Sequence, residues 1–188
     1  VQRKQMTTLG RPNMHAIAVE GDFDDCQLLV KQMFGDSQFR ERVNLTGVNS
    51  INWARVMSQI VYYFSAGAAL GAPNRELNFT VPTGNFGDIF AGYVAKRMGL
   101  SINKLVIATN QNDILHRTLQ TGLYSKQGLK KTISPSMDIQ VASNFERLIF
   151  DLYGGRIDNV QKAMNGLTKN NEFALTFNAL NNLRKDFL

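Results

Sequence analysis

A short glycine-bearing stretch, residues 83–88 (TGNFGD), has the composition of an anion-binding loop. Gly84 and Gly87 can each adopt a positive φ, which would let successive backbone N–H groups turn toward one point. Helical spacing begins at Asp88, so this point lies at a helix N-terminus, where a phosphate is the natural ligand. An ordinary tight turn between a strand and a helix would use the same residues, and these residues alone do not separate the two.

The spacing of the two glycines excludes the common nucleotide-binding motifs. A Walker loop ends in Gly-Lys-Ser or Gly-Lys-Thr, and a dinucleotide fingerprint needs G-x-G-x-x-G. The loop reads Gly84-x-x-Gly87 and contains no lysine. The ligand indicated is therefore an anion other than a classical loop-bound nucleotide.

The elements around the loop predict how it is held. Leu77, Phe79 and Val81 alternate with polar residues, as in a short buried strand that Pro82 ends. The helix that follows has one apolar face, formed by Ala91, Val94, Ala95 and Met98. The loop is thus expected at the carboxyl end of a strand, where open α/β sheets bind ligands.

The sequence of this stretch, PTGNFGD after a strand, closely resembles the pyridoxal phosphate (PLP) phosphate-binding loop of threonine synthases. These are PLP enzymes of the tryptophan-synthase-β-like group. Further matches lie at residues 47–55 (GVNSINWAR), 134–139 (SPSMDI) and 143–148 (SNFERL), in the order of the family. The resemblance extends from about residue 5 to about residue 153 and weakens beyond it.

The resemblance implies a set of site residues. Those implied to hold the PLP phosphate, chiefly by backbone N–H groups, are Gly84, Asn85, Phe86, Gly87 and Asp88. Asn49 and Arg55 are implied to contact the phosphate of the substrate, O-phosphohomoserine. A guanidinium suits this role because it forms paired charge-assisted hydrogen bonds with phosphate. An exposed arginine lying along its own helix is the alternative for Arg55.

The resemblance also implies an activity that this chain cannot perform alone. The family converts O-phosphohomoserine and water to threonine and phosphate, using a lysine that holds PLP as an imine. None of the ten lysines stands in a context like that of the family's lysine, so we assign no catalytic residue and expect the isolated chain to be inactive. It resembles the middle of a longer enzyme, for which assembly into a homo-oligomer is left open. A non-catalytic anion-binding module of the same fold is the alternative.

Strands and helices alternate through the first two thirds of the chain, which predicts an α/β fold. We expect a mostly parallel sheet with helices on both faces, and the resemblance makes it part of the large domain of a fold-type II PLP enzyme. The expected division is a PLP-phosphate-binding α/β domain at residues 1–153 and a helical C-terminal portion at 154–188. The individual elements expected are a strand at residues 14–19, a helix at 23–34 with Asp22 as N-cap, a helix from 51 to about 70 and a strand at 104–108.

Several apolar and polar positions carry more specific expectations. On the helix from residue 51, the expected buried stripe is Trp53, Val56, Met57, Ile60 and Phe64. Cys26 shares a helix stripe with apolar residues, so we expect a buried core thiol. The polar run at residues 109–113 follows a strand and is expected either to line the site or to cap the next helix through Asn112 or Asp113.

Composition limits the class of protein. A chain of 188 residues, 44% of them hydrophobic, suffices for one well-buried domain. The net charge of +6 comes from scattered basic residues, so no nucleic-acid partner is expected. One cysteine and two separated histidines indicate no disulfide and no metal site. No apolar run or leader pattern is evident, so no membrane association and a cytoplasmic location are expected.

Overall fold

The computed structural model describes residues 2–8, 10–21 and 23–188. Residues 1–45 and 46–188 form two compact units, each with its own elements. The first unit contains three helices among its described residues: α1 (Gln2–Thr7), α2 (Phe23–Gly35) and α3 (Ser37–Arg42). The start of α3 is capped by Asp36, whose Oδ1 accepts a hydrogen bond of 2.9 Å from the backbone N–H of Phe39.

The first unit contains one of the two elements that the sequence predicts for it. The helix predicted at residues 23–34 is confirmed as α2, although its predicted N-cap, Asp22, lies outside the described residues. The predicted strand at residues 14–19 is wrong: this segment is irregular, and Ile17 is 85% exposed. A strand needs a neighbour to pair its backbone groups, and the described part of this unit contains no other strand.

The expected buried thiol is also wrong. Cys26 is only half-buried, and Met33 on the same helix is exposed. Of the residues in this unit whose burial is described, only Gln27 is buried. A unit of this size has too little apolar surface to enclose a complete helix face.

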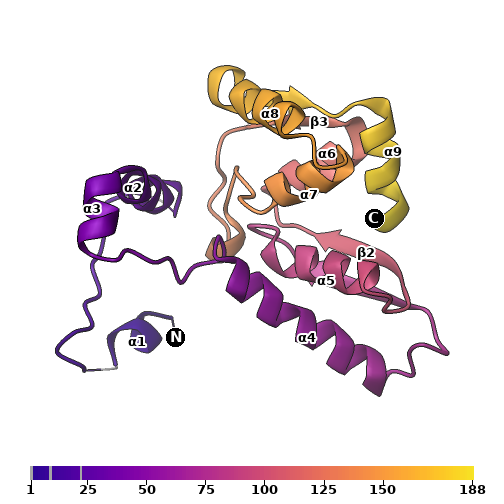
Figure 1. Ribbon diagram of the computed structural model, residues 1–188, viewed down its shortest axis with the longest axis horizontal. Coiled ribbons are helices and arrows are strands. Elements are labelled where there is room, and N and C mark those ends of the chain that lie inside the picture. The colour runs from indigo at the N-terminus through magenta and orange to yellow at the C-terminus, as the bar shows by residue number, and fades with distance from the viewer. Residues whose placement is uncertain (1, 9, 22) are drawn as a thin grey trace. The chain divides into compact units, whose positions relative to one another are not determined.

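The second unit, residues 46–188, combines helices with two small sheets (Figure 1). Its elements in chain order are α4 (Trp53–Ala69), β1 (Leu77–Pro82), α5 (Gly87–Arg97), β2 (Ile102–Ala108), α6 (Ile114–Thr121), β3 (Leu123–Ser125), η1 (Pro135–Met137), α7 (Phe145–Leu152), α8 (Ile157–Asn170), β4 (Glu172–Ala174) and α9 (Phe177–Asp186). Among the described residues, no helix is long and apolar enough to cross a membrane.

The strand pairing confirms a mixed α/β fold but gives smaller sheets than expected. β1 and β2 are parallel and α5 connects them, with Phe79 opposite Leu105 and Val81 opposite Ile107. The other side of β2 is bonded by the C-terminal residues, since Leu188 accepts a 2.7 Å hydrogen bond from the N–H of Ile107. β3 and β4 form a separate antiparallel pair. Residues 154–188, expected to be helical, thus also contribute a strand.

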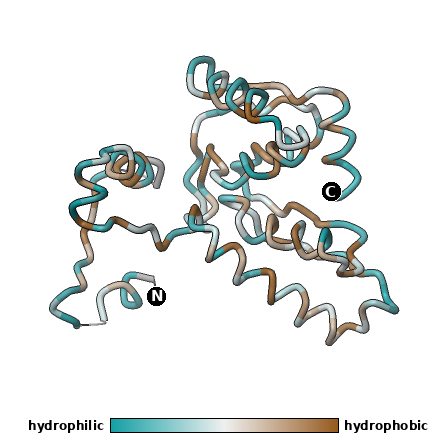
Figure 2. The backbone as a smooth tube through the Cα atoms, viewed as in Figure 1, coloured by the Kyte–Doolittle hydropathy of each residue, from teal (hydrophilic) through white to brown (hydrophobic). Residues whose placement is uncertain are grey.

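The long helix α4 buries only part of the expected stripe, Val56 and Ile60. Asn52 caps its start, because the side-chain oxygen accepts a 2.9 Å hydrogen bond from the N–H of Ala54. Its buried residues are Val56, Ile60, Tyr63 and Gly67. Trp53, Met57 and Phe64 of the expected stripe are exposed. The helix is amphipathic, as its alternating colours in Figure 2 show, but the face turned toward α5 decides which apolar residues are buried.

Close packing surrounds α5, which lies beside α4 in Figure 1 and connects the two parallel strands. Buried positions occur around the whole circumference: Gly87, Ile89, Phe90, Ala91, Gly92, Tyr93 and Ala95. Gly92 is the tightest point. A Cβ atom there would lie 2.6 Å from Cε1 of Tyr63 and 2.9 Å from Cδ2 of Leu105.

We predict that Gly92→Ala destabilises the chain by about 1–3 kcal/mol through overpacking, despite the better helix propensity of alanine. Urea unfolding measures the change. The matched control is Gly128→Ala, because a Cβ atom at Gly128 meets nothing within 4 Å. Equal midpoints for Gly92→Ala and the parent chain would show that Tyr63 and Leu105 move aside at no cost.

Candidate functional site

The turn into α5 is made by a phenylalanine rather than by a glycine. Phe86 is the N-cap of α5 and has left-handed angles, φ 64° and ψ 8°. Neither Gly84 nor Gly87 has a positive φ, so the expectation that the glycines supply this conformation is wrong. Left-handed geometry at a residue other than glycine costs on the order of 1–3 kcal/mol. Packing holds it here, because the Phe86 ring is 1% exposed and lies 5.2 Å from that of Phe145.

The two glycines are needed for space. A Cβ atom on Gly84 would lie 3.1 Å from the backbone oxygen of Ser136, and one on Gly87 would lie 3.3 Å from Nδ2 of Asn144. Both contacts would be tight. The loop of residues 84–88, called here the 84–88 loop, is therefore pressed against two later segments of the chain.

The backbone N–H groups of the 84–88 loop are the hydrogen-bond donors of the candidate site. A left-handed Phe86 followed by helical Gly87 forms the backbone arrangement in which successive N–H groups converge. No described residue accepts a hydrogen bond from the backbone N–H groups of residues 84–88. Oδ1 of Asn85 is buried and also lacks a partner among the described residues. These groups fit a ligand that combines a phosphate with a hydrogen-bond donor.

The carboxylate of Asp88 is bonded to α4. The hydroxyl of Tyr63 donates to the backbone oxygen of Asp88 at 3.0 Å and to its Oδ1 at 3.2 Å. Burial raises the pKa of the Asp88 carboxyl, and the hydrogen bond from Tyr63 acts in the opposite direction. Burial, together with the nearby carboxylate, also raises the pKa of Tyr63. Asp88 would therefore contribute its backbone N–H to an anion, with its carboxylate held by Tyr63.

Asn49 and Arg55 belong to a segment that its own side chains hold in shape. Oδ1 of Asn49 accepts a 3.0 Å hydrogen bond from the N–H of Ile51, and Nη1 of Arg55 donates to the oxygen of Val48 at 3.1 Å. Arg55 is exposed. The structure thus brings Asn49 and Arg55 to the same short segment, but the guanidinium is bonded to that segment and not to the 84–88 loop.

This segment lies against the 84–88 loop through Ser50. The Cβ atom of Ser50 is 3.8 Å from the position that a Cβ atom on Gly87 would occupy. Nδ2 of Asn144 donates to the oxygen of Ser50 at 3.0 Å and to the oxygen of Asn85 at 3.1 Å. One buried side chain therefore joins two of the segments singled out from the sequence.

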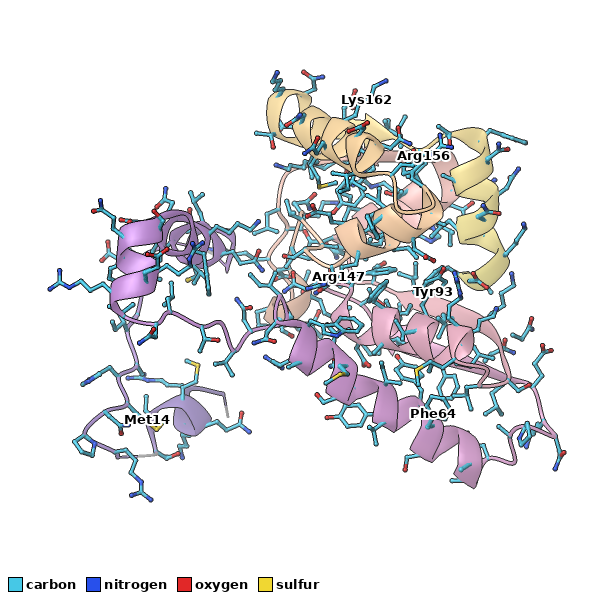
Figure 3. The ribbon with its side chains drawn as sticks, in the orientation of Figure 1. Met14, Phe64, Tyr93, Arg147, Arg156 and Lys162 are labelled. Carbon is cyan, nitrogen blue, oxygen red and sulfur yellow. The ribbon has the colours of Figure 1, made fainter. Side chains whose placement is uncertain are left out.

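Sequence reasoning gave no role to Asn144 and Arg147, although both lie in the matched stretch at residues 143–148. Nε of Arg147 donates to Oδ1 of Asn144 at 3.0 Å, and Nη2 donates to the oxygen of Ile51 at 2.7 Å. Figure 3 labels Arg147, which extends from α7 toward the start of α4. Their role depends on contacts between distant segments, which the sequence pattern does not contain.

The polar residues that follow β2 form hydrogen bonds with the segment of the chain that packs against Gly84. Nδ2 of Asn112 donates to Oδ1 of Asp138 at 3.1 Å and to the oxygen of Lys130 at 2.8 Å. Asn112 therefore bonds to the loop that contains Ser136, the residue beside Gly84. Neither expected cap forms, because Asp113 precedes α6 without a side-chain capping bond. Its carboxylate accepts a 2.9 Å hydrogen bond from Arg117 instead.

Asp138 is the acceptor at the centre of this network. Its Oδ1 accepts from the hydroxyl of Thr132 at 2.7 Å and from Asn110 at 2.8 Å, and its Oδ2 accepts from the N–H of Thr132 at 2.8 Å. These hydrogen bonds, led by the one from the Thr132 hydroxyl, lower the pKa of the Asp138 carboxyl. Ionised Asp138 therefore stabilises the folded chain above pH 3.8, the usual pKa, and the stabilisation is lost as pH falls through its lowered value.

We predict that Asp138→Asn lowers the urea midpoint at pH 7, because an amide group would place N–H donors opposite the donors of Thr132. The difference from the parent chain should shrink as the pH falls from 3.8 through the lowered pKa of folded Asp138, where its carboxyl becomes protonated. Glu76→Gln, which changes an exposed carboxylate outside the network, is the control. A midpoint difference that stays constant down to pH 2 would contradict this account.

A cavity of about 890 Å³ lies beside Arg147, between the start of α4 and the helices α5, α7 and α8. Its walls are largely apolar, and Asp151 provides a polar edge. The hydroxyl of Tyr93 donates to Asp151, while Arg97 forms an ion pair with the same carboxylate at 2.8 Å. Burial, and then the bond to Asp151, raises the pKa of Tyr93 to about 12. Arg97 and Asp151, two of the charged residues that line this cavity, are thus already paired with each other.

No family model matches the chain, but curated relatives do. It is 60% identical over 154 residues to the threonine synthase of Pseudomonas aeruginosa, which covers 82% of this chain and 33% of the relative. The threonine synthase of Saccharomyces cerevisiae is 44% identical over 201 residues, covering 100% of the chain and 39% of the relative. The chain belongs to the threonine synthase family. It spans only about a third to two fifths of the length of these relatives.

Solved structures agree with this assignment. The crystal structure of PLP-bound threonine synthase from Brucella melitensis matches with a TM-score of 0.89 at 57% identity, over 99% of this chain and 40% of that one. The yeast threonine synthase structure matches with a TM-score of 0.83 at 44% identity, over 100% of this chain and 39% of that one. The fold described above is therefore that of the corresponding part of threonine synthases.

Proposed function

We propose that the 84–88 loop binds the phosphate of PLP and that Asn49 and Arg55 contact the phosphate of O-phosphohomoserine. The observation that carries this proposal is the left-handed Phe86 at the start of α5, followed by backbone N–H groups that have no acceptor among the described residues. The PLP-bound relative from Brucella melitensis supports the choice of ligand.

Each residue of the loop has a separate task in this proposal. The backbone N–H groups of residues 84–88 bind the phosphate, with the positive end of the α5 dipole behind them. Asn85 offers its buried Oδ1 to a donor on the bound cofactor. Gly84 and Gly87 keep the loop free of side chains that would fill the site. PLP, when bound, supplies the electron sink that the reaction requires.

Arg55 and Asn49 would recognise the substrate by its phosphate. Nη1 of Arg55 is bonded to Val48, which leaves other guanidinium N–H groups for a phosphate. Oδ1 of Asn49 is bonded to Ile51, and its amide N–H groups form no hydrogen bond with described residues. Because the substrate phosphate is also the leaving group, these contacts would assist both its binding and its departure.

We place this site within a longer threonine synthase that converts O-phosphohomoserine and water to threonine and phosphate. The segment would belong to the large domain of a fold-type II enzyme, with residues 1–153 forming its PLP-phosphate-binding part. The lysine that holds PLP would come from outside these residues. A non-catalytic anion-binding module remains the alternative, favoured by the absence of a lysine in a matching sequence context.

We predict that Gly87→Val weakens PLP binding at least about tenfold in the full-length enzyme, because the added side chain crowds the converging N–H groups. Titration of the apoenzyme with PLP, followed by absorbance and fluorescence, measures the dissociation constant. Stability should fall by only about 1–3 kcal/mol. Gly128→Val is the control, since a Cβ atom there meets nothing within 4 Å. Unchanged PLP affinity in Gly87→Val would overturn the loop assignment.

We predict that Arg55→Ala lowers kcat/KM for O-phosphohomoserine roughly a hundredfold, the effect of losing a charge-assisted contact of about 2–3 kcal/mol. PLP affinity should stay the same, because the guanidinium is not bonded to the 84–88 loop. Steady-state kinetics and PLP titration measure the two effects separately. Arg75→Ala, a second exposed arginine, is the control. Unchanged kinetics in Arg55→Ala would contradict the substrate contact and indicate that Arg55 is an ordinary surface residue.

A further inference from the structure

Asn144 stands at the N-cap of α7 without capping the helix. An asparagine in this place ordinarily accepts a hydrogen bond from a backbone N–H in the first turn, but the Asn144 side chain makes no such bond. The residue is fully buried, at 0% exposure. Its amide donates instead to the oxygen of Ser50 at 3.0 Å and to that of Asn85 at 3.1 Å. Asn144 therefore forms hydrogen bonds with two distant segments in place of a local capping bond.

Arg147 fixes the orientation of this amide. Its Nε donates to Oδ1 of Asn144 at 3.0 Å, which directs the Nδ2 group of Asn144 toward the two carbonyl oxygens. Arg147 also donates a hydrogen bond directly to the segment at residues 49–51, through the oxygen of Ile51 at 2.7 Å. The guanidinium lies over the ring of Trp53, 5.7 Å from its centroid, and this contact limits its movement.

The contacts set the spacing between the two segments of the candidate site. The backbone N–H of Asn144 also donates to the oxygen of Asn85, at 3.0 Å, so Asn85 is held from two atoms of one residue. Gly87 makes room for this approach, since a Cβ atom there would lie 3.3 Å from Nδ2 of Asn144. The neighbouring carbonyl, that of Ser50, is bonded to the same Nδ2 group.

We propose that Asn144 is a positioning residue, oriented by Arg147, that fixes the segment at residues 49–51 relative to the 84–88 loop. This inference rests on the proposed function. On that basis, Asn144 sets the distance between the group that binds the PLP phosphate and the group that binds the substrate phosphate. Asn144 acts on the site through its hydrogen bonds to the backbone oxygens of Ser50 and Asn85.

Amide hydrogen exchange on the 188-residue chain distinguishes a positioning role of Asn144 from a general contribution to the stability of the fold. If Asn144 positions the segments, Asn144→Ala should speed exchange about tenfold or more at the hydrogen-bonded amides of Ile51, Asn52 and Phe90 together, with little change in α6 and α9. Thr118→Val is the control, because it removes a buried hydroxyl that bonds Ile114 within α6. Exchange that rises evenly through the unit in Asn144→Ala would overturn the proposal.

Kinetics of the full-length enzyme provide the second measurement. Asn144→Ala should raise KM for O-phosphohomoserine about tenfold while PLP still binds at stoichiometry. Arg147→Lys keeps the charge but loses the forked geometry, so the same changes should appear in smaller degree. If Asn144→Ala does not fold, Arg147→Lys decides the question by both measurements. Parent-like exchange and KM in Arg147→Lys would overturn the orienting role.

The outcomes distinguish this inference from the proposed function. If the full-length enzyme without substitutions neither binds PLP nor uses O-phosphohomoserine, the proposed function is refuted, whatever the exchange rates show. A parent enzyme with both properties, combined with unchanged exchange and unchanged KM in Asn144→Ala, would refute the positioning role alone.

Discussion

Burial of the Phe86 ring is the interaction on which the candidate site depends. The ring lies 5.2 Å from that of Phe145 and 5.5 Å from that of Phe187, so it joins the start of α5, the start of α7 and the C-terminal residues. Further ring contacts extend the cluster in both directions, to Tyr93, Phe90 and Trp53 on one side and to Tyr124 and Phe173 on the other. Stabilisation from this aromatic packing offsets the strain of a left-handed residue and fixes the direction of the N–H groups beside it.

Buried polar side chains hold the segments around this aromatic cluster in place by hydrogen bonds. Asn144 joins the segment before α4 to the 84–88 loop, and Asp138 with Asn112 holds the loop that passes behind Gly84. A buried polar group left without a partner is costly, so each of these networks strongly favours one arrangement of the backbone. Oδ1 of Asn85, buried without a partner in the described part of the chain, is the exception, and it lies where we place a ligand.

The sequence predicted those features that depend on neighbouring residues. Alternation from Leu77 to Val81 gave the strand, and helical spacing after the loop gave α5, because both periods are local. It failed where the outcome depends on a partner elsewhere. Residues 14–19 have strand-like composition but no pairing strand among the described residues of their unit, and Cys26 lies in a unit where only Gln27 is buried among the residues whose burial is described. Along α4, the predicted burial of Val56 and Ile60 is confirmed, whereas the rest of the predicted stripe is exposed because contact with α5 selects the buried face.

By itself, the sequence determined where the candidate site lies and which family it resembles, because the motifs at residues 47–55, 83–88, 134–139 and 143–148 are each contiguous. Only the tertiary structure decided how the site is built. It assigned the left-handed turn to Phe86 and left the glycines to provide space, and it gave Asn144 its contacts with Ser50 and Asn85. The physical reason is that the φ angle of one residue and the partners of one amide are set by groups distant in sequence, which become neighbours only when the chain folds.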